Sequence, residues 1–201
     1  MRMRNPKYKD DVINNCDFLI TDEINFKDNN KPLYIEIGMG KGNFILNQAL
    51  NNPDINFIGI EKYSSVAAVA IKKMMEYNLD NLKVIISDIT KLEDLLAKKV
   101  DLIFLNFSDP WPKDRHAKRR LTHENFLKLY DSFFKGDNVI IQKTDNDDLF
   151  EFSVNSIKDY GYHIEEISYD LHSTNIPNVK TEYEEKFSNM GIKIKYLKAI
   201  K

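Results

Sequence analysis

The feature of this 201-residue sequence that most constrains its fold is the alternation, from about residue 33, of short β-branched runs with helical periods. Such alternation is typical of a parallel sheet whose strands are joined by crossover helices. Apolar residues at three- and four-residue spacing predict amphipathic helices over 63–78 and 122–134, and another over 146–160 that ends at Gly161. The predicted parallel strands are LYIEI (33–37), NFIGIE (56–61), LKVIIS (82–87), DLIFLNF (101–107) and NVIIQK (138–143).

The end of the chain has a different pattern. A strand is expected near 162–169, and the closing IKIKYLKAI alternates apolar residues with lysine, as a half-solvated antiparallel strand does. We therefore expect an α/β, Rossmann-like fold with a seven-stranded, mostly parallel sheet, an antiparallel last strand and helices on both faces. It would form a single domain over residues 31–201, preceded by a loosely ordered N-terminal extension over 1–30.

Composition excludes several classes of protein. Hydrophobic residues make up 42% of the chain and aromatic residues 11%, enough to fill a core, which excludes a disordered or fibrous chain. The apolar stretches are too short to span a bilayer, so no membrane role is expected. One cysteine excludes a disulfide framework and fits the cytoplasm. The net charge is only −2, but basic residues cluster at Arg2, Arg4, Lys7 and Lys9 and again within 113–120, which leaves room for a polyanionic partner.

Three glycines follow the first strand at the spacing Gly38-x-Gly40-x-Gly42, directly after Glu36 and Ile37. Glycines here allow a tight turn and close approach of a ligand at the carboxyl edge of the sheet. Because Asn43 stands where a dinucleotide fold places its third glycine, S-adenosylmethionine is favoured over a nicotinamide cofactor. The structural alternative is a sharp strand-to-helix turn without a ligand.

Acidic residues end the next two predicted strands. Glu61, 19 residues after Gly42, could accept hydrogen bonds from both ribose hydroxyls, and Asp88 could meet an adenine amino group. Either carboxylate could instead be a solvated strand-end charge or a cap, and Thr90 with Glu93 fits a capping box for the following helix.

The segment after the fourth strand indicates the substrate. Asp109 precedes Pro110-Trp111-Pro112, and proline restricts both its own backbone and that of the preceding residue, so Asp109 is expected to be held stiffly. Five basic residues then fall within the eight positions 113–120, as expected for contacts with nucleic-acid phosphates. The alternative is a solvated charged face.

With these residues, and over nearly everything from residue 33 onward, the sequence closely resembles the bacterial tRNA (guanine-N7)-methyltransferase family, a class I S-adenosylmethionine-dependent group. The matching stretches are IEIGMGKGNF, FIGIEKY, the block DPWPKDRHAKRRL, KTDN and TEYEEKF. The resemblance implies that the enzyme methylates N7 of guanine 46 in the tRNA variable loop, with Asp109 at the catalytic centre beside the cofactor.

The resemblance also implies roles for the other candidate residues. The expected cofactor-binding residues are Glu36, Gly38, Gly40, Gly42, Glu61, Asp88 and Asp109. The expected substrate-binding residues are Lys113, Asp145, Thr181, Glu182, Tyr183 and Glu184. The expected RNA-binding residues are Arg115, His116, Ala117, Lys118, Arg119 and Arg120.

Several of these positions have structural alternatives. Asp145 could be the N-cap of the helix that follows it, and Thr181 with Glu184 fits a capping box. Trp111 could stack on the target base or pack within its own loop. No metal is expected, since His116 and His123 have no third ligand nearby in the sequence.

Two other functions stay open at this point. One is a methyltransferase for an exocyclic amino group of RNA or DNA, and the other is a non-catalytic RNA-binding module with a methyltransferase fold. A dehydrogenase ranks last because of the glycine spacing. The expected partner is tRNA, and the enzyme would be a monomer or a homodimer in the cytoplasm.

Overall fold

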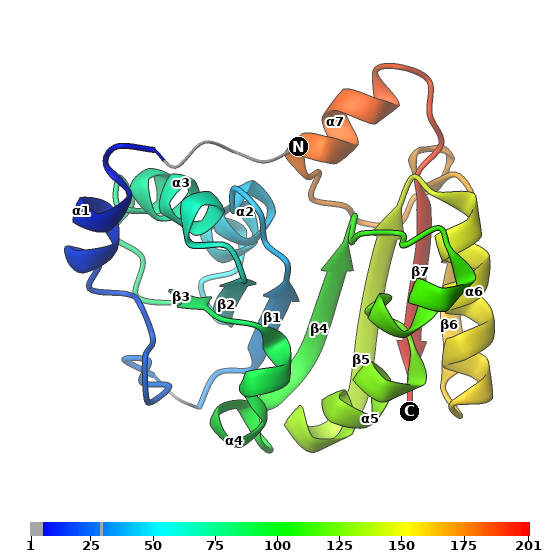
Figure 1. Cartoon of the computed structure of the whole chain (residues 1–201), viewed down its shortest axis with the longest axis horizontal. Coiled ribbons are helices and arrows are strands. Elements are labelled where there is room, and N and C mark those ends of the chain that lie inside the picture. The colour runs from blue at the N-terminus through cyan, green and yellow to red at the C-terminus, as the bar shows by residue number, and fades with distance from the viewer. Residues whose placement is uncertain (1–5, 29) are drawn as a thin grey trace. The chain divides into compact units, whose positions relative to one another are not determined.

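A computed structural model describes residues 6–28 and 30–201, so Arg2 and Arg4 of the N-terminal basic cluster lie outside the described residues. The chain divides into two compact units, one that runs to Leu95 and one that begins at Leu96 (Figure 1). Each unit combines parallel strands with helices, as the alternating sequence pattern predicts.

In the first unit, β2 lies between β1 and β3 and is parallel to both. Every residue of β2 is buried, with Phe57 and Ile58 fully inaccessible, which explains why this run is almost continuously apolar. Helix α3 buries its alanine-rich face, including Ala67 and Ala70. The elements of this unit are α1 (Lys9–Asn14), β1 (Leu33–Ile37), α2 (Asn43–Asn51), β2 (Asn56–Glu61), α3 (Ser64–Met74), β3 (Leu82–Ile86), the 3-10 helix η1 (Ile89–Lys91) and all but the last residue of α4 (Glu93–Leu96).

The segment before β1 also has regular structure within residues 6–28. Helix α1 packs on α3, and Leu19 forms an isolated parallel bridge with Val84 of β3. The backbone N–H of Ile20 donates to the Val84 carbonyl at 2.8 Å, and the Val84 N–H donates to the Phe18 carbonyl at 3.1 Å. The domain boundary at residue 30 stays a prediction.

In the second unit, β4 and β5 are parallel, and β7 runs antiparallel to both β5 and β6. Figure 1 shows α7 beyond the carboxyl ends of β4 and β5. The elements of this unit are β4 (Val100–Asn106), the 3-10 helix η2 (Asp114–Arg119), α5 (Glu124–Phe133), β5 (Phe134–Thr144), α6 (Asp147–Asp159), β6 (His163–Ser168), the 3-10 helix η3 (Leu171–Ser173), α7 (Glu182–Ser188) and β7 (Lys195–Ile200).

The seven strands follow the order β3-β2-β1-β4-β5-β7-β6, which confirms the predicted seven-stranded, mostly parallel sheet with an antiparallel last strand. Helix α6 ends as predicted: Gly161 has φ 96°, its N–H donates to the Lys158 carbonyl at 2.9 Å, and the Tyr162 N–H donates to the Ile157 carbonyl at 3.1 Å. This is the Schellman arrangement. Within the described residues, no helix is long and apolar enough to cross a membrane.

Candidate active site

The glycine loop (residues 38–42) connects β1 to α2 and has a left-handed backbone at its three glycines. Gly38 and Gly40 have φ 78° and 57°, which L side chains rarely adopt, and a Cβ at either position would meet no atom within 4 Å. The Gly38 N–H donates to the Ile60 carbonyl of β2 at 2.8 Å. The loop is therefore fixed to the neighbouring strand while the space beside Gly38 and Gly40 stays open.

Gly42 has a packing role in addition to its φ of 75°. A Cβ there would lie 2.9 Å from Ala70 Cβ and 2.5 Å from Met74 Cε, so its absence lets the start of α2 approach α3. Gly59 of β2 was not singled out by sequence, yet its missing side chain leaves room for Met39, whose Sδ would lie 2.3 Å from a Cβ. A glycine inside a strand is the signal that could have indicated this close approach.

Glu61 joins the end of β2 to the glycine loop. Its buried carboxylate accepts a hydrogen bond from the Gly40 N–H at 3.1 Å and another from the Tyr63 N–H at 2.9 Å. Glu36 is also buried, near the carboxyl end of β1. Glu61 and Gly40 are two of the residues that the sequence predicts to bind a cofactor, and the structure brings them into direct contact.

Asp88 follows β3 and is the N-cap of η1. It accepts hydrogen bonds from the Thr90 N–H at 3.1 Å and from the Thr90 hydroxyl at 2.8 Å, and it forms an ion pair with Lys62 at 2.7 Å. The hydrogen bond from Lys62, helped by those from Thr90 and opposed by partial burial, lowers the pKa of Asp88 to about 2. The alternative capping box of Thr90 with Glu93 is wrong, because Thr90 lies inside η1 and Glu93 is the first residue of α4.

In the second unit, the DPWP turn (residues 109–112) follows β4, with one strained residue just before the turn and one within it. Phe107 and Trp111 have φ 49° and 43° although neither is glycine. Asp109 is exposed, and within the part of the chain that the structure describes its carboxylate has no hydrogen-bond or ion-pair partner. The Trp111 ring meets the His116 ring edge-on at a centroid distance of 5.8 Å, and the Arg119 guanidinium lies 4.8 Å from its centroid.

The basic block (residues 113–120) forms η2 and its flanks, and its side chains differ in environment. Lys113, Arg115 and Lys118 are exposed, with no ionic or hydrogen-bonded side-chain contact among the described residues. Arg120 is only 7% exposed, and it donates to the carbonyls of Pro110 at 3.0 Å and Trp111 at 3.1 Å. Its guanidinium also lies 4.4 Å from the centroid of the Phe152 ring of α6. The block therefore contains solvent-facing cations and one cation directed inward.

Asp145 does not cap α6, so that structural alternative is wrong. The N-cap is Asn146, whose side-chain oxygen accepts from the Leu149 N–H at 2.8 Å. Asp145 is half-buried, and among the described residues its carboxylate has no partner. The buried Lys195 holds this corner by donating to the Asp145 carbonyl at 3.0 Å and pairing with Asp147 at 2.7 Å.

The capping box at the start of α7 is confirmed. The Thr181 hydroxyl accepts from the Glu184 N–H at 2.9 Å, and the Glu184 carboxylate accepts from the Thr181 N–H at 3.3 Å. Tyr183 is 56% exposed, with its ring centroid 5.8 Å from that of Phe107 and 4.9 Å from that of Phe187. The Tyr183 ring thus packs against two aromatic rings and is still largely open to solvent, and the neighbouring Glu182 is also exposed.

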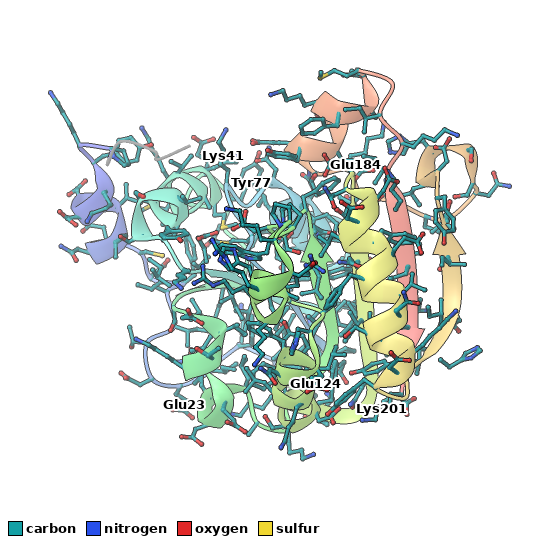
Figure 2. The ribbon with its side chains drawn as sticks, turned by 45° about the vertical axis from the view of Figure 1, so that its right-hand side comes forward. Glu23, Lys41, Tyr77, Glu124, Glu184 and Lys201 are labelled. Atoms are coloured by element: carbon teal, nitrogen blue, oxygen red, sulfur yellow. The ribbon has the colours of Figure 1, made fainter. Side chains whose placement is uncertain are left out.

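The Glu184 side chain is fully buried, on the side of α7 that faces the rest of the second unit (Figure 2). Its carboxylate forms an ion pair with Lys143 at 2.6 Å and accepts hydrogen bonds from His172 at 2.8 Å and from Asn178. Burial raises the pKa of Glu184, but the charge of Lys143 and these hydrogen bonds outweigh it and hold the pKa below its ordinary value. Sequence reasoning missed Lys143, His172, Asn178 and Lys195, because no local pattern shows which distant groups a buried cation or histidine will meet.

No group of three or more histidine, cysteine, aspartate or glutamate side chains in the described ranges could hold a metal ion. The site residues form two sets, one in each unit. The glycine loop, Glu61 and Asp88 belong to the first unit, and the DPWP turn, the basic block, Asp145 and α7 belong to the second.

Comparison with known proteins agrees with this architecture. A family described as putative methyltransferase matches residues 30–197. A solved antibiotic-related methyltransferase shares the fold with a TM-score of 0.64 at 18% identity, covering 85% of this chain and 88% of that one. The 30S ribosomal A1408 methyltransferase from an uncultured bacterium gives a TM-score of 0.59 at 15% identity, covering 95% and 92%. The family match and the fold together define a methyltransferase of class I architecture, which implies a methyl donor of the S-adenosylmethionine type.

Full-length relatives narrow this class. The tRNA (guanine-N(7)-)-methyltransferase of Lachnoclostridium phytofermentans is 46% identical over 100% of this chain and 99% of that protein. The protein of the same name from Bacillus subtilis is 43% identical over 95% of this chain and 94% of that protein. The chain belongs to the tRNA (guanine-N(7)-)-methyltransferase family.

Proposed function

We propose that this enzyme transfers the methyl group of S-adenosyl-L-methionine to N7 of guanine 46 in the variable loop of tRNA. The products would be 7-methylguanosine and S-adenosylhomocysteine, formed in the cytoplasm. The observation that carries the proposal is the exposed Asp109 carboxylate on a proline-held turn, which has no partner among the described residues and is followed in the next segment by the exposed cations Arg115 and Lys118. Relatives that carry this activity in their name, at 43–46% identity over nearly the whole chain, support it.

The residues of the first unit fit S-adenosylmethionine. Open space beside Gly38 and Gly40 would admit the donor close to the backbone, where a Cβ would otherwise stand. Carboxylates accept hydrogen bonds, so Glu61 would bind the ribose hydroxyls and Asp88 the adenine amino group, with Glu36 nearby on β1. When bound, the donor supplies an electrophilic methyl group on a sulfonium.

Asp109 would orient the base and stabilise its developing charge. Guanine N7 has an in-plane lone pair and no proton, so the nucleophile needs no general base. Asp109 can accept hydrogen bonds from the guanine N1–H and amino group, and its negative charge would stabilise the positive charge that builds up on the purine. N7 gains the methyl carbon as the sulfur–carbon bond breaks, and the electron pair of that bond stays on sulfur.

Positioning would supply much of the remaining rate. Holding N7 in line with the methyl group could be worth about 7 to 11 kcal/mol in favourable cases. Lys113, Asp145 and the segment Thr181–Glu184 would contact the substrate, and the exposed cations of the basic block would bind phosphates. Within that segment, Tyr183 offers the exposed ring, whereas the buried Glu184 would act by holding α7 in place.

The decisive experiment maps the methylated atom. The protein is incubated with labelled S-adenosylmethionine and unmodified tRNA, and the RNA is cleaved chemically at 7-methylguanine. Cleavage at position 46 is expected. Label on an exocyclic amino group would favour the alternative methyltransferase, and tRNA binding without transfer would favour a non-catalytic module.

A substitution then tests the role of Asp109. We expect Asp109→Asn to keep its affinity for S-adenosylmethionine, measured by calorimetry, while its single-turnover rate falls by about 100- to 1,000-fold. Asp114→Asn is the matched control, because Asp114 is an exposed aspartate in the adjacent segment. Equal single-turnover rates for Asp109→Asn and the parent would refute the assignment.

A further inference from the structure

Arg120 ends the basic block but is oriented toward the protein. The residue is 7% exposed, and two of its donors are taken: Nε binds the Pro110 carbonyl at 3.0 Å and Nη2 binds the Trp111 carbonyl at 3.1 Å. Its guanidinium carbon lies over the Phe152 ring, 4.4 Å from the ring centroid. Two donors of the guanidinium fork, which lysine cannot reproduce, and a cation–π contact are thus used inside the second unit.

The two carbonyls that Arg120 binds lie in the most strained part of the turn. Trp111 has φ 43°, a left-handed conformation that is unfavourable for any residue with a side chain. Arg120 binds the carbonyl of Trp111 and that of the residue before it, so it holds the backbone at this strained point. Asp109 precedes Pro110 directly, so the direction of its carboxylate depends on the same short segment.

The other arginines and lysines of the block have different surroundings. Arg115 and Lys118 are exposed and make no ionic or hydrogen-bonded contact with the described part of the chain. Arg119 is exposed as well, with its guanidinium over the Trp111 ring at 4.8 Å. Phosphate contacts therefore fall naturally to Arg115 and Lys118, whose charged groups are already in solvent.

We propose that Arg120 is a positioning residue that fixes the DPWP turn and thereby aims Asp109, while Arg115 and Lys118 provide the phosphate contacts of the block. This inference rests on the proposed function, since it gives different roles to residues of one substrate-binding segment. Arg120 would affect the rate of methyl transfer, and the two exposed cations would affect the affinity for tRNA.

Paired substitutions at Arg120 and Arg115 separate the two roles. Lysine keeps the charge but cannot reproduce the fork, so Arg120→Lys should lower kcat by about 100-fold at saturating tRNA, as a displaced catalytic group does. Lys128→Arg is the matched control: Lys128 is exposed on α5 and outside the proposed site, so this variant should keep the kcat of the parent. Methionine removes the charge, so Arg115→Met should reduce the slope of log K against log salt by about one, whereas Arg120→Met should leave that slope unchanged.

Tryptophan fluorescence reports on the turn without any RNA. Trp111 is the single tryptophan of the chain, so its quenching by acrylamide measures access to the turn alone. Quenching should increase in Arg120→Lys and stay at the parent level in Arg115→Lys. If Arg120→Met fails to fold, Phe152→Leu replaces it: this removes the aromatic ring beside the Arg120 guanidinium and should lower kcat less than Arg120→Lys does, with an unchanged salt slope.

The proposal is overturned if Arg120→Lys has parent-like turnover, if its Trp111 quenching is unchanged, or if loss of the Arg120 charge lowers the salt slope as much as loss of the Arg115 charge. Failure of the proposed function would look different, because the parent protein itself would then place no methyl group on guanine N7. In that case the quenching experiment still decides whether Arg120 holds the turn.

Discussion

Replacement of Glu184 by glutamine should destabilise the protein strongly while leaving its shape nearly unchanged. One carboxylate oxygen faces Lys143 at 2.6 Å and the Thr181 N–H at 3.3 Å, and the other faces His172 and Asn178. An amide has only one acceptor oxygen, so in either orientation its NH₂ group would face donors. The buried Lys143 ammonium, with a side chain 3% exposed, would also lose its counter-charge.

The size of the destabilisation follows from the burial of both Glu184 and Lys143. Breaking a buried ion pair by removing one partner costs about 3 to 5 kcal/mol, because the remaining charge stays desolvated. For a chain of this length each kcal/mol lowers Tm by about 2 to 4 °C. Glu184→Gln should therefore lower Tm by roughly 6 to 20 °C.

The effect should depend on pH in a defined direction. The pKa of Glu184 is held below its ordinary value of 4.5, so its ionisation contributes stability above that pH. The contribution is lost as the pH falls through the lowered pKa. The difference between parent and Glu184→Gln should therefore be full at neutral pH and shrink below 4.5.

Urea unfolding followed by circular dichroism, at neutral and acidic pH, measures this difference. Glu185→Gln is the matched control, since Glu185 is exposed in the same first turn of α7 and its charge there is worth only about 0.3 to 1 kcal/mol. If the two variants were equally stable at neutral pH, the Glu184 ion pair would not stabilise α7 as argued.

Two further predictions concern the first unit. The free energy of unfolding of Gly42→Ala, measured with urea, should be about 1 to 3 kcal/mol lower than that of Gly40→Ala. Both substitutions strain the backbone, but only Gly42→Ala forces a Cβ against Ala70, and equal stabilities would contradict this. Asp88→Asn should be less stable than the parent at neutral pH. The difference in stability, measured by unfolding followed by circular dichroism, should disappear as the pH is lowered from 3.8 through the Asp88 pKa of about 2. A difference that persists at the acidic end would mean that the Asp88 carboxylate is not the cause.

The sequence was most informative where the local pattern is strong. Strands β1 and β2 have the predicted bounds, because their apolar runs end at a proline or asparagine on one side and at a glycine or a charged residue on the other. Strand β5 was predicted from residue 138 but begins at Phe134, where α5 continues directly into the strand. The residues Phe134–Asp137 carry no β-branched signal, so only the pairing of Val100 with Phe134 extends the strand to this point.

The candidate site shows the same division. The glycine spacing and the DPWP turn were visible in sequence because they depend on backbone restrictions of single residues. The sequence did not show whether Asp145 or Asn146 caps α6, because both side chains cap well and only the backbone conformation decides which residue starts the helix. The inward orientation of Arg120 was also hidden, because its acceptors are backbone carbonyls, which every residue possesses.

The short contact of residues 18–20 with β3 has a consequence for handling the protein. β3 is at one end of the strand order, and Val84 there would present an unsatisfied N–H and carbonyl if Phe18 and Ile20 did not bind them. Uncovered strand margins recruit strands from other molecules. A version trimmed to the recognisable catalytic portion would keep every proposed ligand-binding residue and yet be prone to self-association and precipitation.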